Sequence, residues 1–64
     1  MRLTEFWGRM HAAFGETYAG SVARDQVLAG LGGRTVEQAL AAGVPAKDVW
    51  RAVCQDLEVP ARLR

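Results

Sequence analysis

Glycines and prolines divide this chain into short pieces, and that division limits what it can fold into. The breaks fall at Gly15, Gly32, Gly33, Gly43, Pro45 and Pro60. No piece alternates apolar and polar residues for long enough to predict a strand. Apolar residues instead recur every three or four positions, which is the spacing of one helix face. The sequence therefore predicts an all-α fold, a small bundle of four short helices.

The expected helices span residues 3–14, 17–31, 35–42 and 45–57. Thr35 and Gln38 match a capping box, in which each side chain bonds the other residue's backbone N–H group, so a helix should start there. Thr4 is expected to cap the first helix. Pro45 suits the first position of the last helix because its missing N–H group would be unpaired there anyway.

The second expected helix carries apolar residues on two faces. One face is lined by Ala19, Ala23, Val27 and Leu31. Tyr18 and Val22 lie nearly opposite. Either neighbours contact this helix on two sides, or a break at Gly20 and Ser21 divides it. We expect one helix that can bend at that point and that ends before the glycine pair.

A chain of 64 residues has room for one domain, residues 1–64, with 60–64 as a short basic tail that has few anchors. Its large apolar side chains suffice for one small core and leave no space for an enclosed substrate cavity. No apolar run approaches the roughly 20 residues that span a bilayer. Because Cys54 is the one cysteine, no internal disulfide can form, which fits the reducing cytoplasm.

The stretch from Thr35 to Leu57 has the shape of a helix-turn-helix, and its last two expected helices would meet at the corner 43–45. In such DNA-binding motifs the second helix lies in the major groove. Lys47, Trp50 and Arg51 would then face the bases.

Periodicity and charge argue against DNA binding. Val49, Val53, Leu57 and Trp50 share one apolar arc of about 100° on an ideal helix. Asp48 lies close to two cations and would repel phosphate. The chain has eight basic and seven acidic residues, without the basic excess that phosphate binding favours. We therefore expect two bundle helices that meet at a corner, with Trp50 facing the core, and keep DNA binding as the alternative.

No residue pattern indicates catalysis or metal binding. His11 is the one histidine and has no second ligand at metal-binding spacing. Cys54 has no catalytic partner and is expected to be buried and inert. Carboxylates occur singly, and glycine patterns that cradle phosphate are absent. We expect no enzyme activity, no metal, no cofactor and no small-molecule substrate.

The remaining interpretation is a helical module that binds another protein or a second copy of itself. The exposed candidates for contact are Arg24, Arg34, Lys47, Arg51 and, if it is not buried, Trp50. Either Arg24 or its neighbour Asp25 could instead form an ion pair between helices.

Three segments together resemble a known family: MRLTEFW at the start, ARDQVLAGLGGRTVEQAL in the middle and VWRAVC near the end. The family comprises small actinobacterial proteins known only as a domain of unknown function, and the resemblance covers essentially the whole chain. It implies a compact, all-helical, cytoplasmic protein. Members are often encoded near the recombinase and its regulatory partner of the DNA-repair system, which implies that setting but no activity. They often have tryptophan where this chain has Val22, and the family supplies no catalytic residues to carry over.

Overall fold

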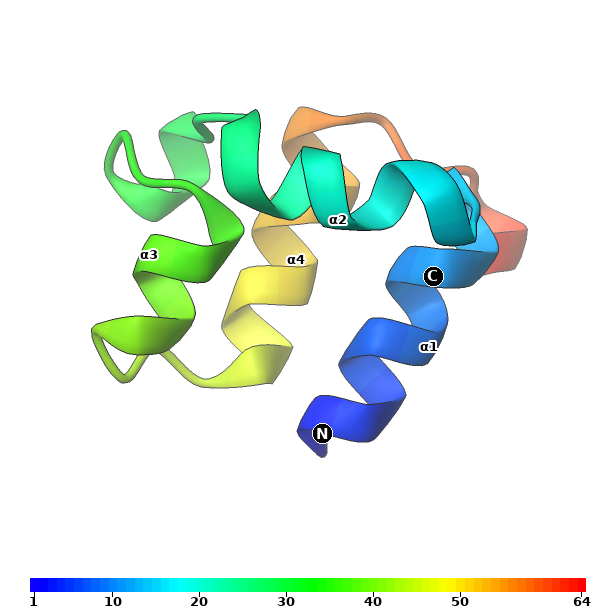
Figure 1. Cartoon of the computed structure of the whole chain (residues 1–64), viewed down its shortest axis with the longest axis horizontal. Coiled ribbons are helices and arrows are strands. Elements are labelled where there is room, and N and C mark those ends of the chain that lie inside the picture. The colour runs from blue at the N-terminus through cyan, green and yellow to red at the C-terminus, as the bar shows by residue number, and fades with distance from the viewer.

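The computed structural model describes residues 1–64 as a set of short helices (Figure 1). The elements are α1 (Leu3–Phe14), α2 (Glu16–Asp25), the 3-10 turn η1 (Ala29–Leu31), α3 (Val36–Ala41), α4 (Ala46–Asp56) and the 3-10 turn η2 (Ala61–Leu63). There are no strands, and the one β-type pairing is an isolated bridge between Leu28 and Arg34. The expected all-α bundle is confirmed.

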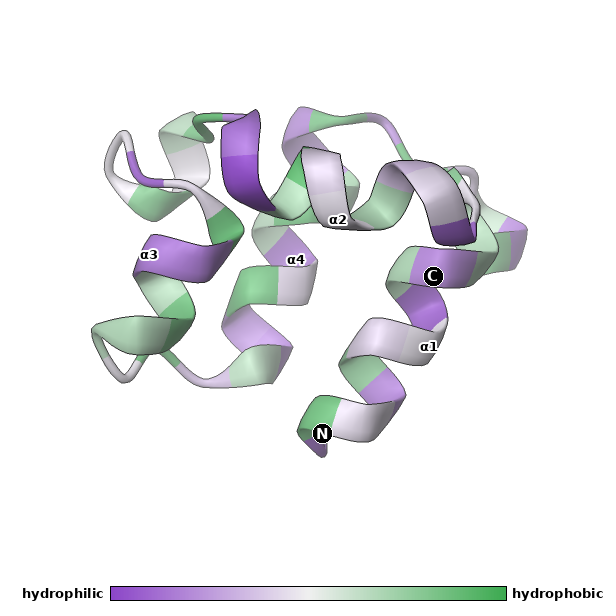
Figure 2. Ribbon diagram, in the orientation of Figure 1, coloured by the Kyte–Doolittle hydropathy of each residue, from purple (hydrophilic) through white to green (hydrophobic).

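Helix α4 is the central element of the bundle. It contacts α1, α3 and η1, while α2 packs on α1 and α3. The buried residues of α4 are Val49, Trp50, Ala52, Val53 and Cys54. Figure 2 shows hydrophobic and hydrophilic residues alternating along α4, as one buried face requires. Phe6 and Met10 of α1 complete the middle of the core, and both are fully buried.

The predicted capping box at the start of α3 is confirmed. The backbone N–H of Gln38 donates to Thr35 Oγ1 at 3.1 Å, and the backbone N–H of Thr35 donates to Gln38 Oε1 at 3.0 Å. The expectation that Thr4 caps α1 is wrong. Helix α1 begins at Leu3, with Arg2 as its N-cap and no side-chain bond there.

The continuous helix expected over residues 17–31 is wrong in its second half. Helix α2 ends at Asp25, and Gln26 is extended, with φ −83° and ψ 117°. The extended backbone turns Leu28 into the core, where it is 2% exposed, and leaves Val27 61% exposed. Burying the larger side chain favours this arrangement over a helix that would direct Val27 inward.

A closed loop replaces the missing helical turns. The N–H of Leu28 donates to the carbonyl of Arg34 at 3.0 Å, and the N–H of Gly33 donates to the carbonyl of Leu28 at 3.1 Å. Gly33 has a φ of +80°, which side-chain-bearing residues rarely adopt. The loop carries η1 onto α4, where the N–H of Gly30 donates to Asp56 Oδ2 at 2.8 Å.

The end of the chain is held more firmly than the sequence indicated. Val59 is buried, and its N–H donates to the carbonyl of Cys54 at 3.1 Å. Residues 60–64 were expected to have few anchors, and this is wrong, because η2 packs on α1 and Arg64 makes two hydrogen bonds to residues outside this segment. The end of the chain thus lies beside α1 (Figure 1).

Two glycines give a matched test of the backbone. Gly20 lies within α2 and Gly43 follows α3 with a φ of +89°, and an added Cβ meets nothing within 4 Å at either site. Gly20→Ala should raise the free energy of unfolding by about 0.5–1 kcal/mol, because alanine favours the helix. Gly43→Ala should lower it by about 1 kcal/mol, because alanine is strained at the positive φ that glycine adopts freely. Urea denaturation measures both, and shifts of the same sign would contradict the backbone described.

The contact between η1 and α4 gives a second test. A Cβ at Gly30 would lie 3.0 Å from the Cβ of Ala52 and 3.1 Å from Asp56 Oδ2. Gly30→Ala should therefore cost about 1–3 kcal/mol of stability, as overpacking does. Gly8→Ala in α1 is the control, because its Cβ would meet open space. Equal thermal denaturation midpoints for the two variants would show that η1 does not pack on α4 in this way.

Candidate functional site

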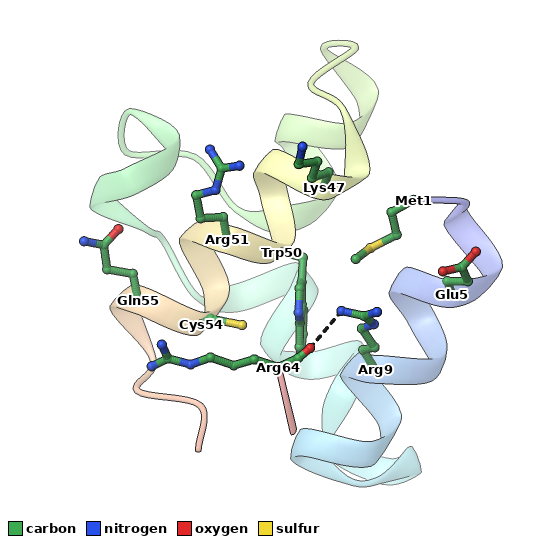
Figure 3. A pocket seen from close by; sticks show the side chains of 9 residues that line it. All are labelled: Met1, Glu5, Arg9, Lys47, Trp50, Arg51, Cys54, Gln55 and Arg64. Atoms are coloured by element: carbon green, nitrogen blue, oxygen red, sulfur yellow. Dashed lines mark hydrogen bonds between the residues drawn. The ribbon is translucent and has the colours of Figure 1, made fainter. Parts of the chain in front are cut away.

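An open cleft of about 750 Å³ lies between α1 and α4 (Figure 3). Its lining residues are Met1, Glu5, Arg9, Lys47, Trp50, Arg51, Cys54, Gln55 and Arg64. It is the one cleft found in the structure. Figure 3 shows that α1 and α4 form its two walls and that Arg64 lies across one end.

Helical spacing places the side chains of each wall. Glu5 and Arg9 are four residues apart on α1, so the turns of the helix bring them to one side, and Met1 precedes the helix. Lys47, Arg51 and Gln55 follow the same spacing on α4. Trp50 and Cys54 form a second row on α4, turned further towards the core, where both are buried. Each helix thus gives one face to the core and an adjacent face to the cleft.

Trp50 forms the floor of the cleft. The residue is 4% exposed, and its ring makes a T-shaped contact with Phe6, with centroids 6.1 Å apart and planes at 87°. The prediction that Trp50 faces the core is confirmed. Its Nε1–H group is also buried and has no hydrogen-bond acceptor. Leaving such a donor unpaired costs roughly 1–3 kcal/mol.

The charge of the cleft differs from that of the chain. Four of the eight lysine and arginine side chains line it, against one of the seven carboxylates, Glu5. Lys47 takes part in no ion pair, and Arg51 has one loose pair with Asp48 at 3.8 Å, in which both side chains are at least half exposed. Exposed pairs of this kind contribute little to stability. The cleft is therefore a cationic site on a chain whose net charge is only +1.

Two hydrogen bonds hold Arg64 across the end of the cleft. Its Nε–H donates to the carbonyl of Val59 at 2.8 Å, and its own carbonyl accepts from Arg9 Nη1 at 2.8 Å. Figure 3 draws this second bond beside the Trp50 ring. The guanidinium of Arg9 is thus already paired with an oxygen atom inside the cleft.

The thiol of Cys54 is buried and free, as predicted. Burial raises the pKa of this thiol above its ordinary value, and the nearby charges of Arg64 and Arg9 offset only part of that rise. A thiol with a raised pKa is mostly protonated near neutral pH and is a poor nucleophile. Beside this thiol, the charged side chains that line the cleft are three arginines, one lysine and one glutamate.

Sequence reasoning found part of this site. Lys47, Trp50 and Arg51 meet in the cleft, whereas Arg24 and Arg34 lie outside it. Arg24 forms an exposed 3.5 Å pair with its own neighbour Asp25, so neither residue joins two helices. The four-residue spacing of the residues from α1 was a usable signal that sequence reasoning missed. No local pattern indicates that Arg64 joins them.

The remaining candidates from the sequence show no further site. His11 lies near Trp7, with ring centroids 6.4 Å apart. No three His, Cys, Asp or Glu side chains are grouped so that they could hold a metal ion. None of the helices is both long and apolar enough to cross a bilayer.

The raised pKa of the thiol predicts how stability changes at alkaline pH. The unfolded chain loses the proton of Cys54 at lower pH than the folded protein does. The contribution of the protonated Cys54 thiol to the stability of the fold is therefore complete below the pKa of the thiol in the unfolded chain. It is lost as the pH rises through the pKa of the thiol in the folded protein. Cys54→Ala should flatten the fall in stability between about pH 7.5 and 9.5, where thiols ionise. Urea denaturation at the two pH values measures the free energy of unfolding of the wild type and the variant. An equal fall in that free energy for the two proteins would contradict the prediction.

Comparison with known proteins gives one match. Residues 1–62 match a family described as protein of unknown function, DUF3046. No curated protein and no solved structure is similar enough to count as a match. Because the match covers nearly every residue of the bundle, including all of α1 and α4, the chain belongs to the DUF3046 family.

Proposed function

We propose that this protein is a non-catalytic module that binds another protein through the cleft between α1 and α4. The observation that carries the proposal is the cationic cleft with an unpaired tryptophan donor in its floor. Interfaces are enriched in tryptophan and arginine, which combine apolar area with hydrogen-bond donors. The proposed contact residues are Arg9, Lys47, Trp50, Arg51 and Arg64.

The absence of catalysis is part of the proposal, and the chemistry of the cleft supports it. Glu5 is the single Asp or Glu side chain that lines it, so no second acidic side chain is present to work with it as an acid–base pair. The thiol of Cys54 has a raised pKa, which opposes a role as nucleophile. We further propose that the protein works in the cytoplasm, in a DNA-repair setting. The free thiol agrees with the first point, and the sequence resemblance described above is the support for the second.

DNA binding by α3 and α4 is the second candidate, favoured by the exposure of Lys47 and Arg51 on α4. Two features count against it. Five of the eleven residues of α4 are buried, Trp50 among them, so the indole is not presented to bases. The cations also line a concave cleft that they share with Glu5, whereas a reading helix projects outwards into the groove.

A capture experiment with matched variants tests the proposed function. The wild-type protein and the double variant Lys47→Glu, Arg51→Glu are used as bait in the cell extract of the source organism, and bound proteins are identified by mass spectrometry. Arg24→Glu is the control, since it reverses an exposed charge outside the cleft. We expect a partner that the wild type and Arg24→Glu retain and the double variant loses. Identical bound proteins for all three baits would contradict the proposal.

A mobility-shift titration separates the two candidates. A specific DNA-binding protein is expected to hold duplex DNA at about 0.15 M salt. Because we propose that this protein binds another protein instead, duplex DNA should give no shifted band under those conditions. A band that Lys47→Ala and Arg51→Ala both weaken would move DNA binding to first place.

A further inference from the structure

We propose that the occupant of the cleft is an acidic segment of a partner protein. Its carboxylates would pair with Arg9, Lys47 and Arg51, and an apolar side chain between them would lie against the edge of Trp50. This inference rests on the proposed function and names the chemistry of its ligand.

Charge complementarity is the first support. The cations of the cleft have few partners within the protein, because Lys47 has none and the pair of Arg51 with Asp48 is long and exposed. Guanidinium groups bind carboxylates with two parallel hydrogen bonds, which makes such pairs stronger than neutral ones. An acidic ligand would therefore gain new charged bonds to Lys47 and Arg51 without breaking a close ion pair.

The state of Arg9 is the second support. Its Nη1 donates to the carbonyl oxygen of Arg64 at 2.8 Å, so this guanidinium is directed at an oxygen atom within the cleft. Arginine has five N–H donors, and this is the one hydrogen bond that the Arg9 side chain makes within the protein. A ligand carboxylate can use the others, or can replace the Arg64 carbonyl.

The unpaired donor of Trp50 is the third and independent support. Trp50 is 4% exposed as a residue, and its buried Nε1–H has no acceptor. An oxygen atom of the ligand would supply that acceptor. Because the nitrogen is covered, a side chain of the lining must first move. Arg64 can move most easily, since its exposed side chain is held by the single bond to the carbonyl of Val59.

The same observations disfavour single-stranded nucleic acid as the occupant. Such ligands are held by bases that stack on the faces of exposed aromatic rings. Trp50 is 4% exposed and lies in a T-shaped contact with Phe6, so its ring is not open to a stacking base. Tyr18 is 69% exposed, but it belongs to α2 and does not line the cleft.

Peptide titration tests the inference on the full chain. The probe is a blocked pentapeptide with four aspartate or glutamate residues around one central leucine. Its control replaces the carboxylates with the corresponding amides, and oligothymidylate of equal charge tests the nucleic-acid alternative. Binding is followed by NMR through the indole N–H signal of Trp50, and dissociation constants come from the same titration. Trp7→Phe assigns that signal.

We expect the acidic peptide to bind weakly, with a Kd of about 0.1–1 mM, and to shift the Trp50 indole signal as a hydrogen bond forms. Lys47→Ala and Arg51→Ala should each raise the Kd about tenfold, the effect of losing about 1.4 kcal/mol of a charged hydrogen bond. Arg24→Ala, outside the cleft, should leave it unchanged.

Three results would overturn the inference. These are equal binding of the amide peptide, tighter binding of oligothymidylate, and no binding of the acidic peptide. If the acidic peptide fails while a partner is still captured in a cleft-dependent way, protein binding stands and the acidic chemistry is wrong. If capture shows no such partner but the peptide still binds, and the variants weaken that binding as expected, the acidic-ligand site is confirmed. The proposal that the cleft binds another protein is then wrong.

Discussion

The packing of Trp50 on Phe6 is the contact on which the rest of this structure depends. It joins α1 to α4 through two side chains that are 0% and 4% exposed. Edge-to-face pairs add about 0.5–1.5 kcal/mol to the free energy gained by burying the rings themselves. The same contact holds the walls of the cleft at their separation, so the core and the proposed binding site share one support.

The residues of α4 that stabilise the core and those that line the cleft lie on different sides of the helix. Val49 and Val53 face the core and are fully buried, whereas Lys47, Arg51 and Gln55 face outwards along the cleft. Changing the outer row removes charge without leaving a cavity, so it can alter recognition at little cost in stability. Trp50 belongs to both sets, because its ring fills the core and its edge lines the cleft.

The sequence predicted what depends on local spacing and missed what depends on distant contacts. Helical periodicity correctly assigned α1, α3 and α4, and it correctly turned Trp50 inward. It failed after Asp25, because the loop there is held by a bond from Gly30 to Asp56, 26 residues away. The site followed the same rule. The residues on α4 could be found from their spacing, but the bond from Arg9 to Arg64 spans 55 residues and leaves no local signal.

Fluorescence of a Trp7→Phe variant tests the central claim most directly, because Trp50 is then the only tryptophan. The substitution keeps an aromatic ring beside Phe6. An indole in the floor of the cleft should emit at short wavelength and resist quenching by iodide until the protein unfolds. Emission typical of tryptophan in water, with full quenching in the folded protein, would show that Trp50 is not part of the core and would contradict both the packing and the site built upon it.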